Sequence, residues 1–202
     1  MDILILSPIL LITFVILYGL VSTIYLLRKK TSIIQLLINL SFYIYLFLLI
    51  NKSLFPIPIS EEYIQMLIEQ ETESQNKFIP LDIKNMIDSY TLSGIFDNLL
   101  LLTPFGFYAP LVFKRINNLK STLLLVFITS ISIETSKLLI SSLISFTYKG
   151  FVIDNIILNT IGGLIGFLIL ALLIPILKKL FNKNKMYFDH NKFFIKENIN
   201  EN

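Results

Sequence analysis

Charged and amide side chains interrupt long apolar stretches of this sequence. Glu134 and Lys137 lie within the run from residue 119 to residue 146, and Asn159 lies near the start of the run from 156 to 177. A charge at the centre of a bilayer costs roughly 2.5 to 3.5 kcal/mol on insertion scales, so such groups face protein or water rather than lipid. We therefore expect these side chains to form a polar site inside a helical bundle.

The stretch around Glu134 repeats polar residues at helical spacing. Ser130, Glu134, Lys137 and Ser141 follow one another at intervals of 4, 3 and 4 residues, which places them on one narrow stripe of a helix. Glu134 and Lys137 are one turn apart, and two interpretations stay open. Either they form a neutralised ion pair that only holds the bundle together, or Glu134 acts as a base or binds a cation. A buried pair without further partners often fails to recover its desolvation cost, which supports the second interpretation.

A second polar face enters the last apolar run. Asn155, Asn159, Gly162 and Gly166 share one side of a helix. The two glycines form a small-xxx-small pair, for which close helix packing is the simplest interpretation. Packing does not explain the asparagines, which are candidates for the same polar site. Asp154, just outside them, adds a carboxylate at the predicted outer mouth.

The run from 98 to 113 contributes further candidates. Asp97 and Asn98 lie at its predicted outer end, and Pro104 and Gly106 lie in its interior. A proline inside a helix removes one backbone hydrogen bond, so a kink is expected at Pro104. The complete set of candidate site residues is Asp97, Asn98, Glu134, Lys137, Asp154 and Asn159.

Other kinds of site find little support in the sequence. It has no cysteine, which excludes disulfides, thiolate metal sites and thiol catalysis. Its single histidine, His190, stands alone in a polar tail, so neither a metal site nor a cofactor is expected. The net charge of +3 does not indicate nucleic acid, because the basic residues lie at the ends of apolar runs rather than on one basic and aromatic face.

The apolar composition and the length of the apolar runs predict the helices that position these residues. Of 202 residues, 54% are hydrophobic and only 15% are charged, unlike a soluble domain. A transmembrane helix needs about 20 predominantly apolar residues. Five runs approach or reach that length, namely 3–27, 33–50, 98–113, 119–146 and 156–177. The predicted fold is an all-α, polytopic membrane bundle of about five transmembrane helices with short external amphipathic helices.

The distribution of lysine and arginine predicts the orientation in the cell membrane. Twelve basic residues fall in one set of alternate loops and the tail, four fall in the other set, and Lys137 lies inside a run. Basic residues near spans tend to stay cytoplasmic, which predicts the N-terminus outside and the C-terminus inside. Because Asp2 precedes the first run and a basic cluster follows it, we expect that run to remain as an anchor rather than a cleaved signal.

The chain is predicted to divide into four segments. Residues 1–50 hold two transmembrane helices, 51–94 form an external loop, 95–177 hold three transmembrane helices, and 178–202 form a polar cytoplasmic tail. The tail is expected to be partly disordered or to lie on anionic lipid. Within the loop, the sequence LFPIP at 54–58 cannot form a regular helix because of its prolines, and we expect it to fold back on the helix ends.

Two amphipathic helices are predicted in the external loop, which carries seven carboxylates against three lysines. After Ser60 as an N-cap, Ile64, Leu67 and Ile68 share one helical face, and residues 83, 86, 87 and 90 repeat this periodicity after Pro80. Both could lie flat on the outer membrane surface. They either cover loop backbone only or form a lid over the polar site.

Three motifs give the sequence a resemblance to a known family. The run FDNLLLLTPFGFYAPLVFKR is followed by ISIETSKLL and then by GFVIDNIILNTIGGLIGF. In this order they resemble the VanZ-like family, named for an accessory protein of glycopeptide antibiotic resistance. The resemblance is strongest over roughly residues 94–170, and LFPIP with FIPLDIKNMI resembles a weaker upstream part.

The resemblance assigns family positions to particular residues of this chain. The family's asparagine before its PFGF corresponds to Asn98, and the proline and glycine correspond to Pro104 and Gly106. Its membrane glutamate corresponds to Glu134. Its final motif matches at Asp154, Asn159, Thr160, Gly162 and Gly163.

Four positions depart from the family pattern. Lys137 stands where the family usually has glutamine, and Val152 and Asn155 stand where it usually has aspartate. Lys149 replaces a usual arginine, which keeps the charge and loses the bidentate fork. If the family's chemistry needs its full acidic cluster, this chain is an altered member.

The resemblance implies a bacterial membrane protein associated with lowered susceptibility to teicoplanin-type lipoglycopeptides, in a family without an established catalytic mechanism. The leading hypothesis is a cell-envelope protein whose intramembrane polar site opens to the outer face and recognises a polar or cationic group. The expected partners are membrane lipid and either a lipid-linked cell-wall precursor or the lipoglycopeptide itself.

Two alternatives stay open. One is a membrane-embedded enzyme that acts on a lipid-linked envelope precursor with a carboxylate as general base. The other is a small transporter or a helper subunit. No nucleophile with its base is readable in the sequence, so it does not decide whether the protein is an enzyme.

Overall fold

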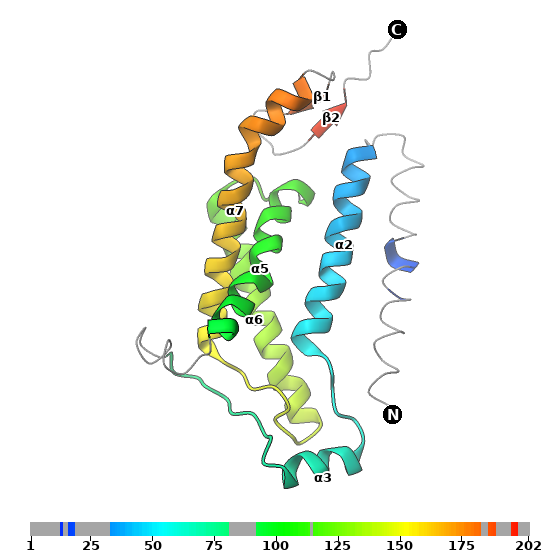
Figure 1. The fold of residues 1–202 in the computed structure, drawn as a ribbon, viewed down its shortest axis with the longest axis vertical. Helices are drawn as coiled ribbons and strands as arrows, with labels where there is room; N and C mark the ends of the chain where they lie inside the picture. The colour runs from blue at the N-terminus through cyan, green and yellow to red at the C-terminus, as the bar shows by residue number, and fades with distance from the viewer. Residues whose placement is uncertain are drawn as a thin grey trace.

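The computed structural model describes most of the chain from residue 33 onward. The described residues are 13, 16–18, 33–80, 92–113, 115–182, 186–188 and 195–197. The elements named within them follow in the order α2, α3, α5, α6, α7, β1 and β2. The long helices run in alternating directions along a common axis (Figure 1).

Four long helices form the bundle. α2 spans Ile33–Leu54, α5 spans Leu92–Val112, α6 spans Leu119–Leu143 and α7 spans Ile153–Asn182. Each is long and apolar enough to cross a membrane. Their outward side chains include many large apolar residues that lie open at the surface, as expected where lipid covers the protein. The protein is a helical membrane bundle.

These helices correspond to four of the five predicted spans. The third predicted span begins earlier than expected, since α5 starts at Leu92, and it continues as helix through Pro104 and Pro110. A helix in an apolar bundle tolerates such prolines because neighbouring groups satisfy the freed carbonyls. The first predicted span, 3–27, lies almost wholly outside the described residues, and the predicted amphipathic helix after Pro80 lies outside them too.

Glycines allow α5 and α7 to lie in close contact. A Cβ atom added at Gly162 or Gly166 would overlap a backbone carbonyl of α5, and one added at Gly106 would overlap the backbone of Gly163. Gly163 also lies directly against the side chain of Val126 on α6. The small-xxx-small interpretation is therefore confirmed, because these positions have no room for a side chain.

Aromatic rings connect α2 to α5. The ring of Phe42 lies 5.9 Å from that of Phe105 and 5.8 Å from that of Tyr108, between ring centroids. Tyr45 donates a hydrogen bond from its hydroxyl to the carbonyl oxygen of Leu101 at 2.8 Å. α2 thus packs on α5 by side chains, whereas α7 packs on α5 by backbone.

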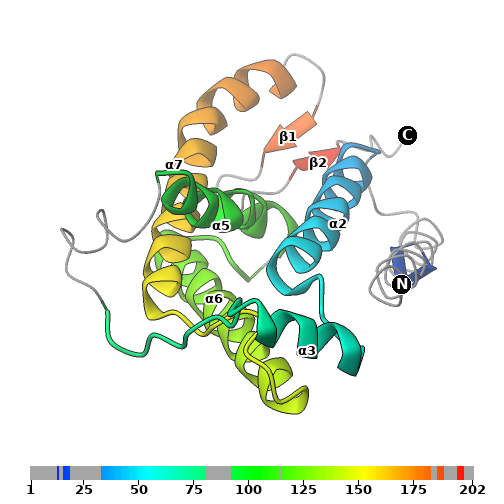
Figure 2. The same cartoon turned by 60° about the horizontal axis from the view of Figure 1, so that its bottom comes forward.

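One end of the bundle is covered by a short helix, α3, which spans Glu61–Glu69. α3 lies across the end at which α2 and α6 finish and α7 begins (Figures 1 and 2), and we call this the α3 end. The helix starts directly after Ser60, as predicted, although the Ser60 side chain makes no capping hydrogen bond. Residues 55–60, which contain most of LFPIP, have no regular secondary structure, in agreement with their prolines.

The chain after α3 pairs with the loop between α6 and α7. The backbone N–H of Lys77 donates to the carbonyl of Phe151 at 2.7 Å, and the N–H of Ile153 donates to the carbonyl of Lys77 at 3.0 Å. The rings of Phe78 and Phe151 stack with centroids 5.2 Å apart. This pairing holds the loop that leads into α7.

A short antiparallel ribbon follows α7. β1, Met186–Phe188, pairs with β2, Ile195–Glu197, and Tyr187 lies opposite Lys196. The sequence predicts no strand in this tail. The two segments satisfy each other's backbone hydrogen bonds, and β1 also contacts α7.

Candidate functional site

Glu134 is fully buried on α6 and accepts hydrogen bonds from three groups. Lys137 Nζ lies 2.6 Å from Oε1, and Asn155 Nδ2 donates to the same oxygen at 3.4 Å. The backbone N–H of Val152 donates to Oε2 at 3.1 Å. The carboxylate therefore joins α6 to the start of α7.

The buried face of α6 is the polar stripe expected from the sequence. Along this face the helix buries Thr122, Val126, Ser130, Glu134, Lys137 and Ser141. Its opposite side carries apolar residues that face outward. The polar stripe faces protein because a lipid-facing charge would lose its hydration without gaining a partner.

Two asparagines extend the cluster to α5 and deeper along α7. Asn98 donates from Nδ2 to Oδ1 of Asn155 at 3.0 Å, so the contacts of Glu134 reach α5. Asn159 donates from Nδ2 to Oγ of Ser130 at 2.9 Å. We call the set of Asn98, Ser130, Glu134, Lys137, Asn155 and Asn159 the Glu134 cluster.

Two members of the Glu134 cluster keep unused hydrogen-bonding capacity. Oδ1 of Asn159 is buried without a hydrogen-bond partner in the described part of the chain. The ammonium of Lys137 has three donors, and Glu134 is its one acceptor among the same residues. The Lys137 side chain is only 11% exposed, so bulk water does little to satisfy these groups.

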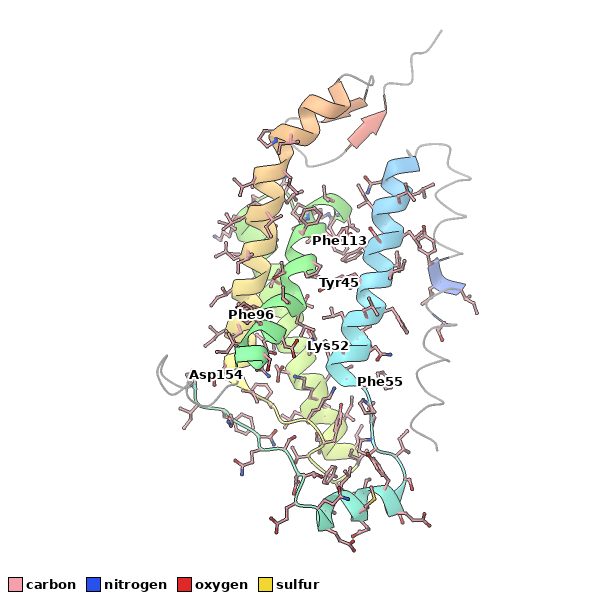
Figure 3. All side chains as sticks on the ribbon, viewed as in Figure 1. Tyr45, Lys52, Phe55, Phe96, Phe113 and Asp154 are labelled. Carbon is pink, nitrogen blue, oxygen red and sulfur yellow. The ribbon has the colours of Figure 1, made fainter. Side chains whose placement is uncertain are left out.

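The two predicted aspartates lie in different environments. Asp154 is completely buried in the first turn of α7, where the helix dipole favours a carboxylate. Asp97 is paired with Lys52 at 2.7 Å on the surface, with side chains 60% and 56% exposed. Figure 3 shows Asp154 and Lys52 at the α3 end of the bundle.

Asp97 was predicted to be part of the polar site, but it lies on the surface outside the buried cluster. Consecutive residues of a helix point about 100° apart. When Asn98 faces α7, its neighbour Asp97 must face elsewhere. The prediction that both residues line one site is wrong for Asp97.

The loop between α6 and α7 contributes two residues that are not among the candidate site residues, although Lys149 stands at the position of a usual family arginine. Lys149 donates from Nζ to three backbone carbonyls at the end of α2, at 2.7 to 3.2 Å, the shortest contact being to Phe55. Tyr148 donates from its hydroxyl to the carbonyl of Leu54 at 3.0 Å. The last carbonyls of a helix have no partner within the helix, so this loop caps α2. No spacing rule connects a loop lysine to a helix end that lies almost 100 residues earlier.

Burial changes the acidity of both loop residues. Burial, together with the positive charge of Lys137, lowers the pKa of Lys149 to about 8. Burial raises the pKa of Tyr148 to about 12. At neutral pH the lysine therefore carries a positive charge for most of the time, and the tyrosine is neutral.

A cavity of about 200 Å³ lies at the α3 end, between α3, residues 55–60, which we call the proline segment, and the loop after α6. It is lined by Pro56, Pro58, Tyr63, Leu67, Thr72, Phe146, Tyr148 and Lys149. No member of the Glu134 cluster lines it. Among its lining residues, Lys149 is the single formally charged side chain at neutral pH.

The chemistry of the Glu134 cluster fits recognition of polar or cationic groups. Glu134 and Asn159 present acceptor oxygens, and the hydroxyl of Ser130 contacts an amide rather than a base. In the described part of the chain, no group of three or more His, Cys, Asp and Glu side chains is arranged to hold a metal ion.

The fold defines a polytopic helical membrane protein, and near one end of its bundle lies a cluster of buried polar side chains. The model of the VanZ/LLP1 family matches residues 42–174, from within α2 through most of α7. The chain belongs to the VanZ/LLP1 family, as its motifs predict. No curated protein and no solved structure matches it.

Proposed function

We propose that this VanZ-like membrane protein lowers the susceptibility of a bacterial cell to teicoplanin-type lipoglycopeptides through the Glu134 cluster. In this proposal the cluster recognises a polar or cationic group of a lipoglycopeptide or of a lipid-linked cell-wall precursor. The observation that carries it is the buried Glu134 carboxylate, whose contacts link α5, α6 and α7 near the α3 end. Family membership supports the proposal, because VanZ-like proteins are associated with lowered susceptibility to teicoplanin-type lipoglycopeptides.

The proposal includes an orientation in the membrane. With five passes, the N-terminus and the α3 end lie outside, and the C-terminus lies in the cytoplasm. Supporting this orientation, Arg115 lies in the loop between α5 and α6 and Lys120 in the first turn of α6, at the end opposite to α3 (Figure 1). A site near the α3 end would then be close to the outer leaflet, where lipoglycopeptides act.

The experiment compares teicoplanin and vancomycin susceptibility in a susceptible Gram-positive host that expresses wild-type protein or single variants. Glu134→Gln and Asp154→Asn remove a carboxylate charge while keeping the side-chain size. Glu62→Gln, at an exposed position of α3, removes a carboxylate outside the cluster and is the matched control. Membrane protein levels are equalised before the comparison.

We expect the wild type and Glu62→Gln to reduce teicoplanin susceptibility. Glu134→Gln, within the cluster, and Asp154→Asn, at the buried carboxylate beside it in the sequence, should lose this effect. Lys137→Gln distinguishes recognition from simple stabilisation. It releases Glu134 from its internal cation, so it should strengthen the effect at equal protein level even if the protein is less stable. Unchanged susceptibility in both carboxylate variants, in a host where the wild type acts, would rule the cluster out.

A further inference from the structure

The cavity at the α3 end lies at the level expected for lipid headgroups. Its lining residues Pro56 and Pro58 follow the end of α2, and Phe146 and Lys149 follow the end of α6 at Leu143. The headgroup region adds several ångströms beyond each face of the hydrocarbon core, which is about 30 Å thick. Residues that follow the end of a transmembrane helix by only a few positions therefore lie in the headgroup region. This holds whichever face of the membrane the α3 end occupies.

The charged side chain of the cavity, Lys149, forms no ion pair with a carboxylate of the described residues. Within the described residues, the two ion pairs are Lys52 with Asp97 and Lys137 with Glu134. Lys149 contacts backbone carbonyls and no carboxylate. The neighbouring charge of Lys137 has the same sign and destabilises the protonated amine. A bound anion would relieve this unfavourable interaction.

The remaining walls suit an apolar or amphipathic body. Prolines, Leu67 and three aromatic rings make up most of the lining, and the hydroxyl of Thr72 adds a polar group. The Thr72 hydroxyl donates to the carbonyl of Leu67 at 2.8 Å, so its oxygen can still accept. Tyrosines are typical of membrane interfaces, where the ring lies in apolar surroundings and the hydroxyl meets water.

We propose that this cavity binds an oxyanion carried on an apolar body, with the anion against Lys149 and the body against Pro56, Tyr63 and Phe146. Lys149 would exchange its longest carbonyl contact, 3.2 Å to Ser53, for the oxyanion. The two shorter contacts would keep capping α2. This site is separate from the Glu134 cluster and does not depend on the function proposed for it.

A membrane lipid is the expected source of the oxyanion. Glu61, Glu62 and Glu69 of α3 are exposed at this end and repel dissolved anions. A lipid phosphate reaches the cavity laterally through the bilayer and brings its own apolar body. A small dissolved anion is the other source of the same chemistry, and the experiment separates the two.

The experiment measures lipid retention by the full-length protein, purified in detergent and delipidated, using native mass spectrometry. The probes are phosphatidylglycerol, which has a net negative charge, phosphatidylcholine, which has none, and inorganic phosphate. We expect phosphatidylglycerol to bind about tenfold more tightly than phosphatidylcholine, because the choline cation offsets the phosphate charge within its own headgroup and opposes the Lys149 ammonium, whereas phosphatidylglycerol keeps its net negative charge. If phosphate alone binds and displaces the lipid, the natural source is a small anion, and the anion site still stands.

Four variants localise the binding. Lys149→Gln removes the charge and Leu67→Trp fills the cavity with Lys149 intact, so both should lose the tenfold preference. Lys149→Arg keeps the charge and should retain it, and so should Lys120→Gln, which removes an exposed cation at the opposite end. If Lys149→Gln fails to fold because α2 loses its cap, Leu67→Trp and Lys149→Arg still test whether the lipid preference depends on this cavity. Equal binding of both lipids, or an unchanged preference in Leu67→Trp, would overturn the proposal.

The retention of phosphatidylglycerol should also depend on pH. The charged groups near Lys149 are Lys137 with Glu134 on α6, and Lys52 near the end of α2 with its partner Asp97 on α5. Glu73 is a further carboxylate at this loop, where it accepts a hydrogen bond from the N–H of Thr147 at 3.2 Å. Tyr148 stays neutral until about pH 12. Without a bound anion, the ammonium of Lys149 loses its proton near pH 8, and a bound anion shifts this loss to higher pH. Retention of phosphatidylglycerol should therefore be full at pH 7 and fall above pH 8. Constant retention up to pH 11 would contradict a role for the Lys149 charge.

Discussion

At the scale of single residues, the partners of Glu134 decide what its carboxylate can do. Lys137 neutralises it, while Val152 and Asn155 donate further hydrogen bonds from the start of α7. Removing either partner of a buried ion pair destabilises the protein, because the remaining charge has neither a partner nor water around it. Glu134 is therefore both a structural link and the candidate recognition group.

A double-mutant cycle measures how strongly the two charges depend on each other. Glu134→Gln and Lys137→Gln should each lower the free energy of unfolding by about 3 to 5 kcal/mol, because each leaves an uncompensated buried charge. The double variant should lose much less than the sum. Denaturant titration and thermal midpoints in detergent provide the measurement.

The control for this cycle is Ser132→Ala, on the exposed side of α6, which should stay within about 0.5 kcal/mol of wild type. Additive losses in the double variant would show that the ammonium and the carboxylate are not coupled. In that case Lys137 would not be the internal cation that restrains Glu134.

At the scale of elements, the packing of α5 on α7 fixes the depth at which the cluster residues meet. Gly162 and Gly166 bring the two backbones together, and Asn159 and Asn155 continue the same face of α7 toward the α3 end. The amide of Asn98 can reach Asn155 only while the two helices stay this close. The glycines therefore position the site without contacting a ligand.

Gly166→Ala tests this dependence. The added Cβ would overlap the carbonyl of Thr103, so α5 and α7 must move apart. Overpacking of this kind lowers the free energy of unfolding by about 1 to 3 kcal/mol or more. We expect a lower thermal midpoint than for Ile165→Ala, which truncates the neighbouring outward side chain. Equal stability of the two variants would mean that the close approach of α5 and α7 is not required.

At the scale of the whole molecule, the α3 end gathers the functional candidates. The Glu134 cluster, Asp154, the Lys149 cap on α2 and the cavity all lie near it, whereas the loop between α5 and α6 lies at the opposite end (Figures 1 and 3). The pairing of the segment after α3 with the loop before α7 closes this end. Which face of the membrane it occupies determines which molecules can reach it.

Orientation can be measured directly because the chain has no cysteine. Single cysteines at Glu62 on α3 and at Asn117 between α5 and α6 are exposed positions at opposite ends. We expect a membrane-impermeant maleimide to label Glu62→Cys in intact cells and Asn117→Cys only after permeabilisation. The wild type is the unlabelled control, and the reverse pattern would place the α3 end in the cytoplasm.

Much of the bundle could be predicted from the sequence because local patterns determine it. Apolar runs of membrane length mark the spans, and the 4, 3, 4 spacing places Glu134 and Lys137 on the buried face of α6. The glycine spacing predicts a close helix contact, and the prolines after Leu54 predict the end of α2. These features depend on neighbours within a few residues, which the sequence displays.

Contacts between distant segments were decided only by the tertiary structure. The sequence cannot show whether Asp97 or Asn98 faces α7, because that depends on the rotation of α5 within the bundle. It cannot show that Lys149 caps α2, since a loop can reach many helix ends. The cavity likewise exists only where α3, the proline segment and the loop after α6 meet. Helical periodicity fixes which residues share a face, and packing alone selects what that face meets.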